Sequence, residues 1–287
     1  MIMTDLSAYL RHGLLSDEGV QVFRTLVYGM YAEHGRYTMP WRQTTNPYHI
    51  VVSEVMLQQT QVCRVMQQYQ KFIDLFPTVY ILAQASLRDV LALWSGLGYN
   101  RRARYLQQAA TIIVERYDGI VPHEQLLLQT LPGIGQNTAG SIAAFAYAEP
   151  VVFIETNIRT VFLYTFFRDQ FDVCDTKLLP LIAQTVDISS PRMWYYALMD
   201  FGAVLKQTVG NPNRHSRQYV RQSPFIGSDR RIRGTIIRLL TQYSTLSYQT
   251  MADMIICDPV QFARVVERLV AEKMLVHNDC LLSISDK

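Results

Sequence analysis

One carboxylate in the sequence lies where it could donate a proton. Glu54 sits in the segment PYHIVVSEVMLQQTQV, four residues after Ile50 and three before Leu57, so a helix places it among apolar neighbours. Burial raises the pKa of a carboxyl group, and a glutamate that keeps its proton near neutral pH can act as a general acid. The usual role of such a residue is a buried ion pair with an arginine. The local sequence supports both interpretations equally.

A glycine-rich turn has the features of a phosphate-binding site. Leu131-Pro-Gly-Ile-Gly135 separates the apolar segment EQLLLQT from the small-residue segment TAGSIAAFAYA, and both segments are expected to be helical. Gly133 and Gly135 allow the backbone to turn sharply and approach a ligand, and the first N–H groups of the second helix attract an anion. We therefore predict a helix-hairpin-helix whose residues Leu131, Gly133 and Gly135 contact DNA, although a Pro-Gly turn alone can be a routine helix connection.

Positive charge is concentrated in one window, although the formal net charge of the whole chain is only +3. Residues 206–238 contain eight basic side chains and a single acidic one, Asp229. A compact, arginine-rich stretch in an otherwise mildly acidic chain suits the neutralisation of phosphates, whereas the simpler interpretation is a solvated linker. We expect Arg214, Arg217 and Arg221 to contact DNA.

The elements that position these residues are expected to be helices. Apolar residues recur at three- and four-residue spacing, with almost no alternating runs before residue 275, so we predict an all-α chain up to the basic window. Helices should begin at Asn46-Pro47, at Ser86, where Asp89 completes a capping box, and at Pro191.

The segment after residue 228 follows a different pattern. IRGTIIRLLTQY, YQTMADMII and PVQFARVVERLVAEK are typical of three helices, and MLVHNDCLLSI of two strands around Asn278-Asp279. Three helices and a hairpin indicate a winged helix, whose third helix would be the recognition helix. Two arginines share that helix with two glutamates, so DNA contact and a protein-contact or packing role are equally supported.

Composition excludes several classes of protein. A chain of 287 residues that is 49% hydrophobic and 18% charged has enough apolar surface for about two globular domains and is not disordered or fibrous. Asp5 and Arg11 interrupt the apolar run of a signal peptide, and the longest uncharged stretch contains Pro132 and Gly133, so we expect no secretory leader and no membrane span. The protein is expected in the cytoplasm, with the nucleoid.

Metal-binding patterns are missing from the sequence. The four cysteines form no CxxC pair, and the six histidines form neither HxxxH nor HxH. The cysteines are therefore expected to be reduced and mostly buried thiols, and a metal-dependent hydrolase is disfavoured.

Several motifs together resemble one family. GRYTMPWR, PYHIVVSEVMLQQTQV, FPTVYILAQASLRDVLALWSGLGYNRRARYL, LPGIGQNTAGSI and MDFGA are similar to the MutY group of helix-hairpin-helix DNA glycosylases, from residue 20 to about 205. The resemblance implies a mainly α, two-lobed glycosylase core at 1–205, followed here by a basic linker at 206–228 and a winged-helix-like domain at 229–287. It also implies that the partner is double-stranded DNA with a mispaired or damaged base, bound by a monomer.

The resemblance assigns roles to individual residues. Glu54 matches the glutamate that protonates the departing adenine, and Arg42 matches a position near the extruded base. Gln59 and Tyr99 match side chains that push into the base stack, and the neighbouring Gln58 is assigned to DNA as well.

The second carboxylate departs from the family pattern. Cutting an N-glycosidic bond creates an oxocarbenium-like sugar that nearby negative charge stabilises. Where the family normally has Asp, the segment VVFIETNIRTV has Glu155, with Asn157 two residues on. Glu keeps the charge but reaches about 1.5 Å further, so its geometry is open. The alternative is that Glu155 is an exposed acid at a helix start and that activity has been lost.

Further departures concern the cofactor and the substrate. The family's four cluster cysteines after MDFGA are replaced by Leu205 and KQTVGNPNRHSRQYVRQSPF, so no iron–sulfur cluster is expected. Asn137 stands where bifunctional relatives carry a Schiff-base lysine, which predicts a monofunctional enzyme. Tyr196 stands where the family places Gln or Glu against the flipped adenine, and the winged helix replaces the family's C-terminal reader of 8-oxoguanine.

The function expected from these features is a monofunctional glycosylase of base excision repair that removes adenine opposite 8-oxoguanine or guanine. Two alternatives stay open. One is a glycosylase for another mispaired base, such as uracil, thymine or hypoxanthine. The other is a catalytically silent protein that binds mismatches.

Overall fold

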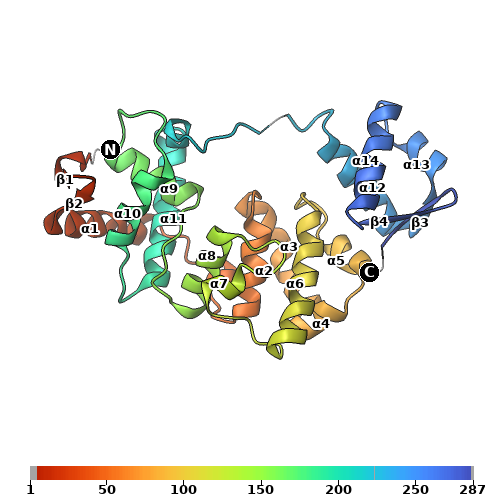
Figure 1. Cartoon of the computed structure of the whole chain (residues 1–287), viewed down its shortest axis with the longest axis horizontal. Coiled ribbons are helices and arrows are strands. Elements are labelled where there is room, and N and C mark those ends of the chain that lie inside the picture. Colours follow the sequence, from red (N-terminus) through yellow and green to blue (C-terminus); the bar gives the residue numbers. More distant parts are fainter. Residues whose placement is uncertain (1–4, 223, 286–287) are drawn as a thin grey trace. The chain divides into compact units, whose positions relative to one another are not determined.

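The computed structural model describes residues 5–222 and 224–285, and helices dominate it (Figure 1). The expected mainly helical architecture is confirmed. The α-helices are α1 (Asp17–His34), α2 (Pro47–Leu57), α3 (Val62–Leu75), α4 (Val79–Gln84), α5 (Leu87–Leu93), α6 (Arg101–Tyr117), α7 (Gln125–Leu128), α8 (Gln136–Tyr147), α9 (Thr156–Phe166), α10 (Asp175–Thr185), α11 (Pro191–Thr208), α12 (Asp229–Tyr243), α13 (Tyr248–Met254) and α14 (Pro259–Ala271). Short 3-10 helices are η1 (Ser7–Tyr9), η2 (Pro40–Arg42) and η3 (Pro212–His215).

The expected helix starts are confirmed. The Asn46 side chain accepts a hydrogen bond from the Tyr48 N–H at 3.0 Å, and α2 begins at Pro47. Ser86 caps α5 by accepting from the Asp89 N–H at 3.1 Å, and its hydroxyl donates to the Asp89 carboxylate at 2.7 Å. The helix α11 begins at Pro191. These starts depend on local capping chemistry, which explains why the sequence predicts them.

A short hairpin near the N-terminus corrects the expectation of an all-α chain. Strands β1 (Leu10–Arg11) and β2 (Leu14–Leu15) pair in antiparallel fashion. The turn residues His12 and Gly13 have φ angles of 53° and 83°, and two positive φ values suit a two-residue hairpin turn. Strands of two residues are too short to show an alternating pattern.

The chain divides into two compact units, each assembled from several segments. Unit 1 comprises Met1–Ile50, His123–Gln129 and Gly135–Arg221. In its core α1 and α9 pack against α11. The Phe23 ring lies 5.2 Å, 5.1 Å and 5.9 Å, between centroids, from the rings of Phe162, Phe166 and Trp194. These aromatic contacts join α1, the second half of α9 and α11.

A glycine permits the close approach of α11 to α9. A Cβ atom at Gly202 would lie 2.3 Å from the backbone oxygen of Asn157, closer than any side chain tolerates. Gly202 belongs to the MDFGA motif. The motif therefore brings the last turns of α11 against the first turn of α9.

Unit 2 comprises Val51–Pro122, Thr130–Ile134 and Gln222–Lys287. Helix α6 packs against α4 and α5. The Phe72 ring of α3 contacts Phe76 and Trp94 with centroids 4.9 Å and 6.0 Å away. The expected boundaries at residues 205 and 228 stay a prediction.

Arg102 ties two loops of unit 2 together. This residue of α6 is only 8% exposed. Its guanidinium donates to the carbonyl oxygens of Val55 (2.7 Å), Met56 (2.9 Å), Leu97 (3.3 Å) and Gly98 (3.1 Å) and to the Thr60 hydroxyl (2.8 Å). Burial lowers the pKa of Arg102 to about 10, which leaves it charged at neutral pH. The end of α2 and the turn after α5 are thus linked through one side chain.

We expect replacement of Arg102 with Met to lower the free energy of unfolding by about 2 kcal/mol, because it leaves buried carbonyl oxygens without a donor. Urea denaturation followed by circular dichroism measures the change. Arg116→Met, at an exposed position of the same helix, is the control and should unfold like the unmodified protein. Equal midpoints for the two variants would contradict the structural role of Arg102.

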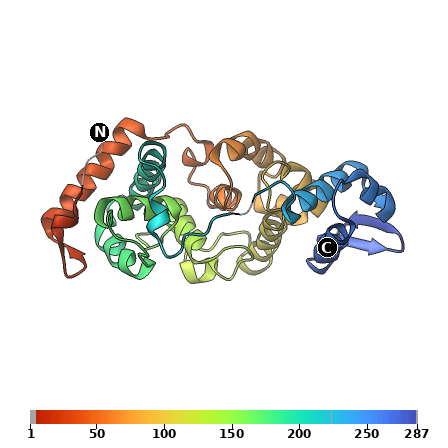
Figure 2. The same cartoon turned by 90° about the horizontal axis from the view of Figure 1, so that it is seen from above.

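Residues 229–285 contain the expected three helices and hairpin, together with one strand that was not expected. The strands β3 (Thr245–Ser247), β4 (Leu275–Asn278) and β5 (Leu281–Ile284) form an antiparallel sheet in the order β3-β5-β4. Strands of this segment are visible as blue arrows in Figure 2. Asp279, in the turn between β4 and β5, has a φ of 53°, in agreement with the predicted tight turn. The buried side chains that join the helices to the sheet include Ile236, Leu240, Val265, Leu269 and Leu282.

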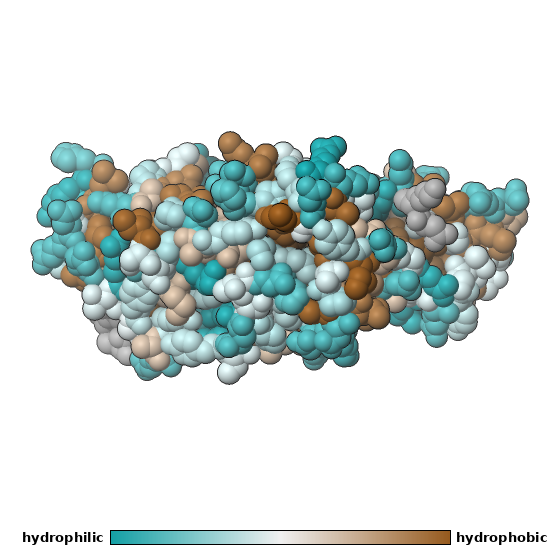
Figure 3. Space-filling model, turned by 90° about the horizontal axis from the view of Figure 1, so that it is seen from below, coloured by the Kyte–Doolittle hydropathy of each residue, from teal (hydrophilic) through white to brown (hydrophobic). Residues whose placement is uncertain are grey.

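The surface mixes polar and apolar side chains. On the face drawn in Figure 3, hydrophobic residues form separate patches among polar ones. Within residues 5–222 and 224–285, no helix combines the length and the apolar character needed to span a bilayer.

Candidate active site

Glu54 lies on α2 in unit 2. The residue is half-buried, and its neighbours Ile50 and Val55 are each 1% exposed. Glu54 is thus half-buried on a helix, and its placement among apolar side chains stays a prediction. Its role as a general acid stays a prediction.

Glu155 is the N-cap of α9 in unit 1. Its Oε1 atom accepts hydrogen bonds from the backbone N–H groups of Asn157 at 2.7 Å and Ile158 at 3.0 Å. These donors belong to the first turn, where N–H groups have no partner within the helix. The residue is half-buried, so the alternative of an exposed acid does not describe it. The cap holds the carboxylate at the positive end of α9.

Lys206 of α11 places a positive charge beside this cap. Its Nζ donates to Asn157 Oδ1 at 2.6 Å. Burial raises the pKa of Glu155, while the charge of Lys206 and the two N–H donors oppose that rise. Burial likewise lowers the pKa of Lys206, against the influence of Glu155. An ionised Glu155 at this position can stabilise positive charge that develops in a bound molecule.

Arg42 and Tyr196 lie together in unit 1. The Arg42 guanidinium forms two hydrogen bonds with the Asp200 carboxylate, at 2.7 Å and 2.8 Å, and lies 4.4 Å from the centre of the Tyr196 ring. Phe145 stacks on the Tyr196 ring, with centroids 4.5 Å apart. Burial raises the pKa of Asp200, but its hydrogen bonds and ion pairs with Arg42 and Arg36 outweigh this effect and lower it. The two residues expected near the base are therefore neighbours in a tightly packed cluster.

Gln59 and Tyr99 occupy the tips of the two loops that Arg102 joins. Both have left-handed backbone conformations, with φ angles of 53° and 49°, which are uncommon for residues other than glycine. Gln59 is exposed and Tyr99 is 36% exposed. Conformations of this kind persist where the surrounding structure holds them, and they often occur at functional sites.

The hairpin turn has the geometry predicted for it. Gly133 has a φ of +76°, and a Cβ atom there would lie 2.9 Å from the Cβ of Tyr105, so a side chain does not fit. Gln58 donates from Nε2 to the Gly133 carbonyl at 3.0 Å, and Gly135 is the N-cap of α8. Leu131 differs from the expectation of DNA contact. The residue is 2% exposed because it packs in the core, so its side chain is not available to a ligand.

Asn137, in the first turn of α8, has a structural partner in unit 1. Its Oδ1 accepts a hydrogen bond from the backbone N–H of Ile154 at 3.3 Å. Ile154 immediately precedes Glu155. Asn137 therefore connects the helix after the hairpin turn to the segment that carries the cap carboxylate.

The predicted phosphate contacts in the basic window lie in unit 1. Arg214 in η3 and Arg221 are exposed. Arg217 is also exposed and forms an ion pair with Asp172 at 2.5 Å. A surface ion pair of this kind is weak and can exchange for a phosphate. Their contact with DNA stays a prediction.

The cysteines do not fit the ligand set of an iron–sulfur cluster. Cys63 lies in α3, Cys174 precedes α10, Cys257 follows α13 and Cys280 lies in the turn between β4 and β5. Two of them are exposed and two are half-buried, so the expectation of mostly buried thiols is wrong, because these positions lie at the surface of their elements. In the part of the chain that the structure describes, no group of three or more His, Cys, Asp or Glu side chains could hold a metal ion.

Comparison with known proteins identifies the family. The sequence profile of the HhH-GPD superfamily base excision DNA repair proteins matches residues 52–273. The chain belongs to the HhH-GPD superfamily. The matched range contains Glu54, the hairpin turn and Glu155.

Several relatives of this HhH-GPD protein have assigned functions. The adenine DNA glycosylase of Mycolicibacterium smegmatis is 32% identical over 263 residues, which cover 85% of this chain and 89% of that protein. The enzyme of the same name from Rattus norvegicus is 36% identical over 226 residues, or 75% of this chain and 42% of that protein. The one from Buchnera aphidicola subsp. Baizongia pistaciae is 35% identical over 188 residues, so this chain matches about half, 53%, of its length.

Solved structures share the HhH-GPD fold. A thermostable thymine-DNA glycosylase superposes with a TM-score of 0.58 at 23% identity and covers 64% of this chain and 86% of its own. Endonuclease III, trapped as a covalent intermediate with DNA, gives 0.54 at 17% identity, covering 66% and 87%. The expected helix-hairpin-helix glycosylase fold is confirmed.

Sequence patterns did not predict the contacts of Lys206, Asp200 and Arg102 in this HhH-GPD protein. Asp200 lies in the MDFGA motif and Arg102 follows WSGLGY, so both positions carried a signal of the family. Lys206 lies three residues after the end of MDFGA, at the start of the segment that replaces the cluster loop. Only the fold shows that it reaches the cap of α9.

Replacement of Lys206 with Met should shift the acidic limb of the pH–rate profile upward by up to about one pH unit, because a neighbouring positive charge no longer favours the Glu155 carboxylate. Arg159, the other charged side chain that lowers the pKa of Glu155, remains in the variant. Single-turnover rates measured across pH give the limb. Lys177→Met, on the exposed side of α10, should leave it in place, and an unmoved limb in the Lys206 variant would contradict the coupling.

Proposed function

We propose that this protein is a monofunctional DNA glycosylase of base excision repair, which hydrolyses the N-glycosidic bond of adenine paired with 8-oxoguanine or guanine. Similarity to a named adenine DNA glycosylase over 85% of the chain supports the substrate. The observation that supports catalysis rather than binding alone is the Glu155 carboxylate, which is held at the cap of α9 and flanked by Lys206. A protein that only binds DNA would not need a carboxylate held in this way.

Glu54 is the proposed general acid. An adenine leaves as a poor anion unless a proton reaches one of its ring nitrogens, and a half-buried glutamate among apolar side chains is suited to hold that proton. After the bond breaks, the same carboxylate can accept a proton from the water that attacks the sugar. The reaction is a hydrolysis and consumes no cofactor.

Glu155 is the proposed electrostatic partner. The sugar gains positive charge as the base departs, and an ionised carboxylate at a fixed position stabilises that charge more than water does. The backbone donors of Asn157 and Ile158 hold one oxygen of Glu155, which limits its movement. Asn137 has no amine that could attack the sugar carbon, so the abasic site should be released without strand cleavage.

Double-stranded DNA with a mispaired base is the proposed partner, bound by a monomer on the DNA of the nucleoid. The base must leave the stack before it can react. Gln59 and Tyr99, at the tips of their loops, would fill the space that it vacates, and the turn at Gly133 would hold a phosphate. Arg42 and Tyr196 would lie beside the extruded base.

One panel of assays tests the function. Single-turnover reactions on duplexes that carry adenine, uracil, thymine or hypoxanthine against each opposite base, followed by alkali, reveal abasic sites as strand breaks. We expect cleavage for adenine opposite 8-oxoguanine or guanine, and only after alkali. Excision of another base would replace the proposed substrate. Binding to mismatches with no excision at all would replace the proposed enzyme by a silent binding protein.

Purified protein should be colourless and should contain no stoichiometric iron, because the four cysteines are too dispersed to ligate a cluster. Elemental analysis and the visible absorption spectrum are the two measurements. Activity should also survive dialysis against a chelator. About four iron atoms per chain would overturn this proposal.

A further inference from the structure

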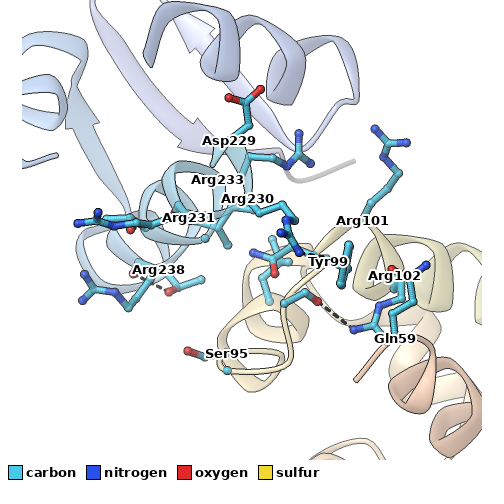
Figure 4. A pocket seen from close by; sticks show the side chains of 18 of the residues that line it. Gln59, Ser95, Tyr99, Arg101, Arg102, Asp229, Arg230, Arg231, Arg233 and Arg238 are labelled. Atoms are coloured by element: carbon cyan, nitrogen blue, oxygen red, sulfur yellow. Dashed lines mark hydrogen bonds between the residues drawn. The ribbon is translucent and has the colours of Figure 1, made fainter. Parts of the chain in front are cut away.

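Unit 2 contains a large pocket with a strong excess of positive charge. Its volume is about 1390 Å³, and its walls come from α3, α6, α12, α14 and the loops that carry Gln59 and Tyr99 (Figure 4). Two carboxylates line it, Asp229 and Glu272. Eight arginines line it, namely Arg64, Arg101, Arg102, Arg230, Arg231, Arg233, Arg238 and Arg268.

The two carboxylates of the pocket form ion pairs with arginines of α6, α12 and α14. Arg101 and Arg233 both pair with Glu272. Arg268 pairs with Asp229 at 3.0 Å. Arg264, the other arginine of α14, also pairs with Asp229 at 3.0 Å. These pairs occupy the arginines of α14, the helix expected to be the recognition helix.

Three exposed arginines of the pocket keep their charge available. Among the described residues, Arg64, Arg231 and Arg238 have no carboxylate within ion-pair distance. Arg231 and Arg238 extend from one side of α12 (Figure 4). They are seven residues apart, or about 10 Å along the helix axis. Two guanidinium groups that far apart can each reach a different phosphate of one DNA strand.

A glycine lies between these two arginines. Gly234 follows Arg231 by three residues and precedes Arg238 by four, which puts all three on one helical face. Glycine in a helix interior destabilises the helix relative to alanine. Among the described residues, and apart from the neighbouring residues and backbone of the same helix, no atom lies within 4 Å of the place where a Cβ would be, so internal packing does not require glycine here. A bare backbone on this face leaves room for a ligand to approach closely.

The pocket also includes the residues proposed to enter the base stack. The Tyr99 hydroxyl accepts hydrogen bonds from Arg230 at 3.2 Å and from Gln222. Gln59 lines the same pocket. The face of α12 and the two loop tips therefore belong to one continuous surface of unit 2.

We propose that α12 is a DNA-binding helix, whose Arg231–Gly234–Arg238 face, together with Arg64, contacts the sugar–phosphate backbone next to the base pair at which Gln59 and Tyr99 insert. This inference rests on the proposed function and adds to it a second contact, made by the C-terminal segment through its first helix. Two separated arginines on both sides of a bare backbone suit a polynucleotide strand better than a small anion, which would need only one of them.

The test measures duplex affinity as a function of salt. Fluorescence anisotropy with a labelled 30-base-pair duplex, with or without one adenine–8-oxoguanine pair, gives Kd at several salt concentrations. The double variant Arg231→Gln with Arg238→Gln should bind both duplexes at least about 10-fold more weakly and lose about two units of salt slope. The control is Lys71→Gln with Arg116→Gln, which removes the same charge from exposed positions of unit 2 outside the pocket.

Gly234→Ala separates binding from folding. Alanine should raise the thermal midpoint of the protein, because it favours the helix, and should nevertheless weaken duplex binding several-fold, because its methyl group occupies the space next to the strand. A merely structural glycine would not give these opposite effects. Unchanged duplex affinity in Gly234→Ala would contradict the close approach of the strand.

The outcomes distinguish the two levels of the proposal. If the unmodified protein excises adenine and the double variant keeps both its Kd and its salt slope, α12 does not bind DNA and the inference is overturned, while the proposed function stands. If no base is excised by the unmodified protein but the double variant loses affinity as described, the helix binds DNA and only the proposed reaction fails.

Discussion

Replacement of Glu54 with Gln is expected to lower the single-turnover rate of adenine excision by at least about 100-fold, while Kd for the duplex stays close to that of the unmodified protein. Glutamine keeps the size and hydrogen-bonding capacity of the side chain but cannot release a proton to the leaving base. Loss of a general acid acts on the chemical step alone, so the rate falls at saturating protein as well.

The measurement uses a duplex with one adenine–8-oxoguanine pair, excess protein, alkali treatment and gel separation of the products. Glu115→Gln, an exposed glutamate of α6 in the same unit, is the matched control and should retain the full rate. Excision that persists in the Glu54 variant would show that another group supplies the proton.

Replacement of Glu155 with Gln is expected to lower the excision rate by about 100- to 1,000-fold, because it removes the negative charge that stabilises the oxocarbenium-like sugar. The amide oxygen of glutamine can still accept from the N–H groups of Asn157 and Ile158, so the cap of α9 and the fold should be preserved. The variant therefore separates charge from structure. Glu155→Asp keeps the charge on a shorter side chain and should retain more activity than Glu155→Gln.

Stability provides the control for the Glu155 variant. Burial raises the pKa of this carboxyl group in the folded protein, so the stabilising contribution of the group is full below its ordinary pKa and is lost as the pH rises through the folded-state value. At pH 7 the neutral glutamine thus avoids the cost of burying a charge, and the thermal midpoint should not fall. A low rate together with a lower midpoint would indicate structural damage instead of lost charge.

The fold was predictable from the sequence wherever a signal is local. Asn46 and Ser86 cap helices through hydrogen bonds to residues two or three positions away, and the hairpin between β4 and β5 depends on its own turn. The strand β3 gave no such signal. The strand has three residues, Thr245–Ser247, and it forms only because it pairs with β5. Two helices separate β3 from β5 in the sequence. Neither capping chemistry nor periodicity carries information of that range.

The candidate site was predictable to the same extent. Glu54, the hairpin turn and Glu155 each lie in a motif that marks their position in the chain. The partners that define their surroundings are distant in sequence. Lys206 is 49 residues from Asn157, and Asp200 is 158 residues from Arg42. Such contacts depend on the packing of α11 against α9 and on the rest of the core, so no pattern within either segment could predict them.

The hydrogen bonds of Arg102 bear on how the protein could search a genome. One guanidinium holds both the loop that ends at Gln59 and the loop that carries Tyr99, through Thr60, Leu97 and Gly98 among other acceptors. The conformational entropy of ordering the two loops is therefore lost once, during folding, and not again at each encounter with an intact base pair. In the proposed role, Gln59 and Tyr99 should therefore enter the base stack together, in a single kinetic step. Undamaged sequence should then be released quickly.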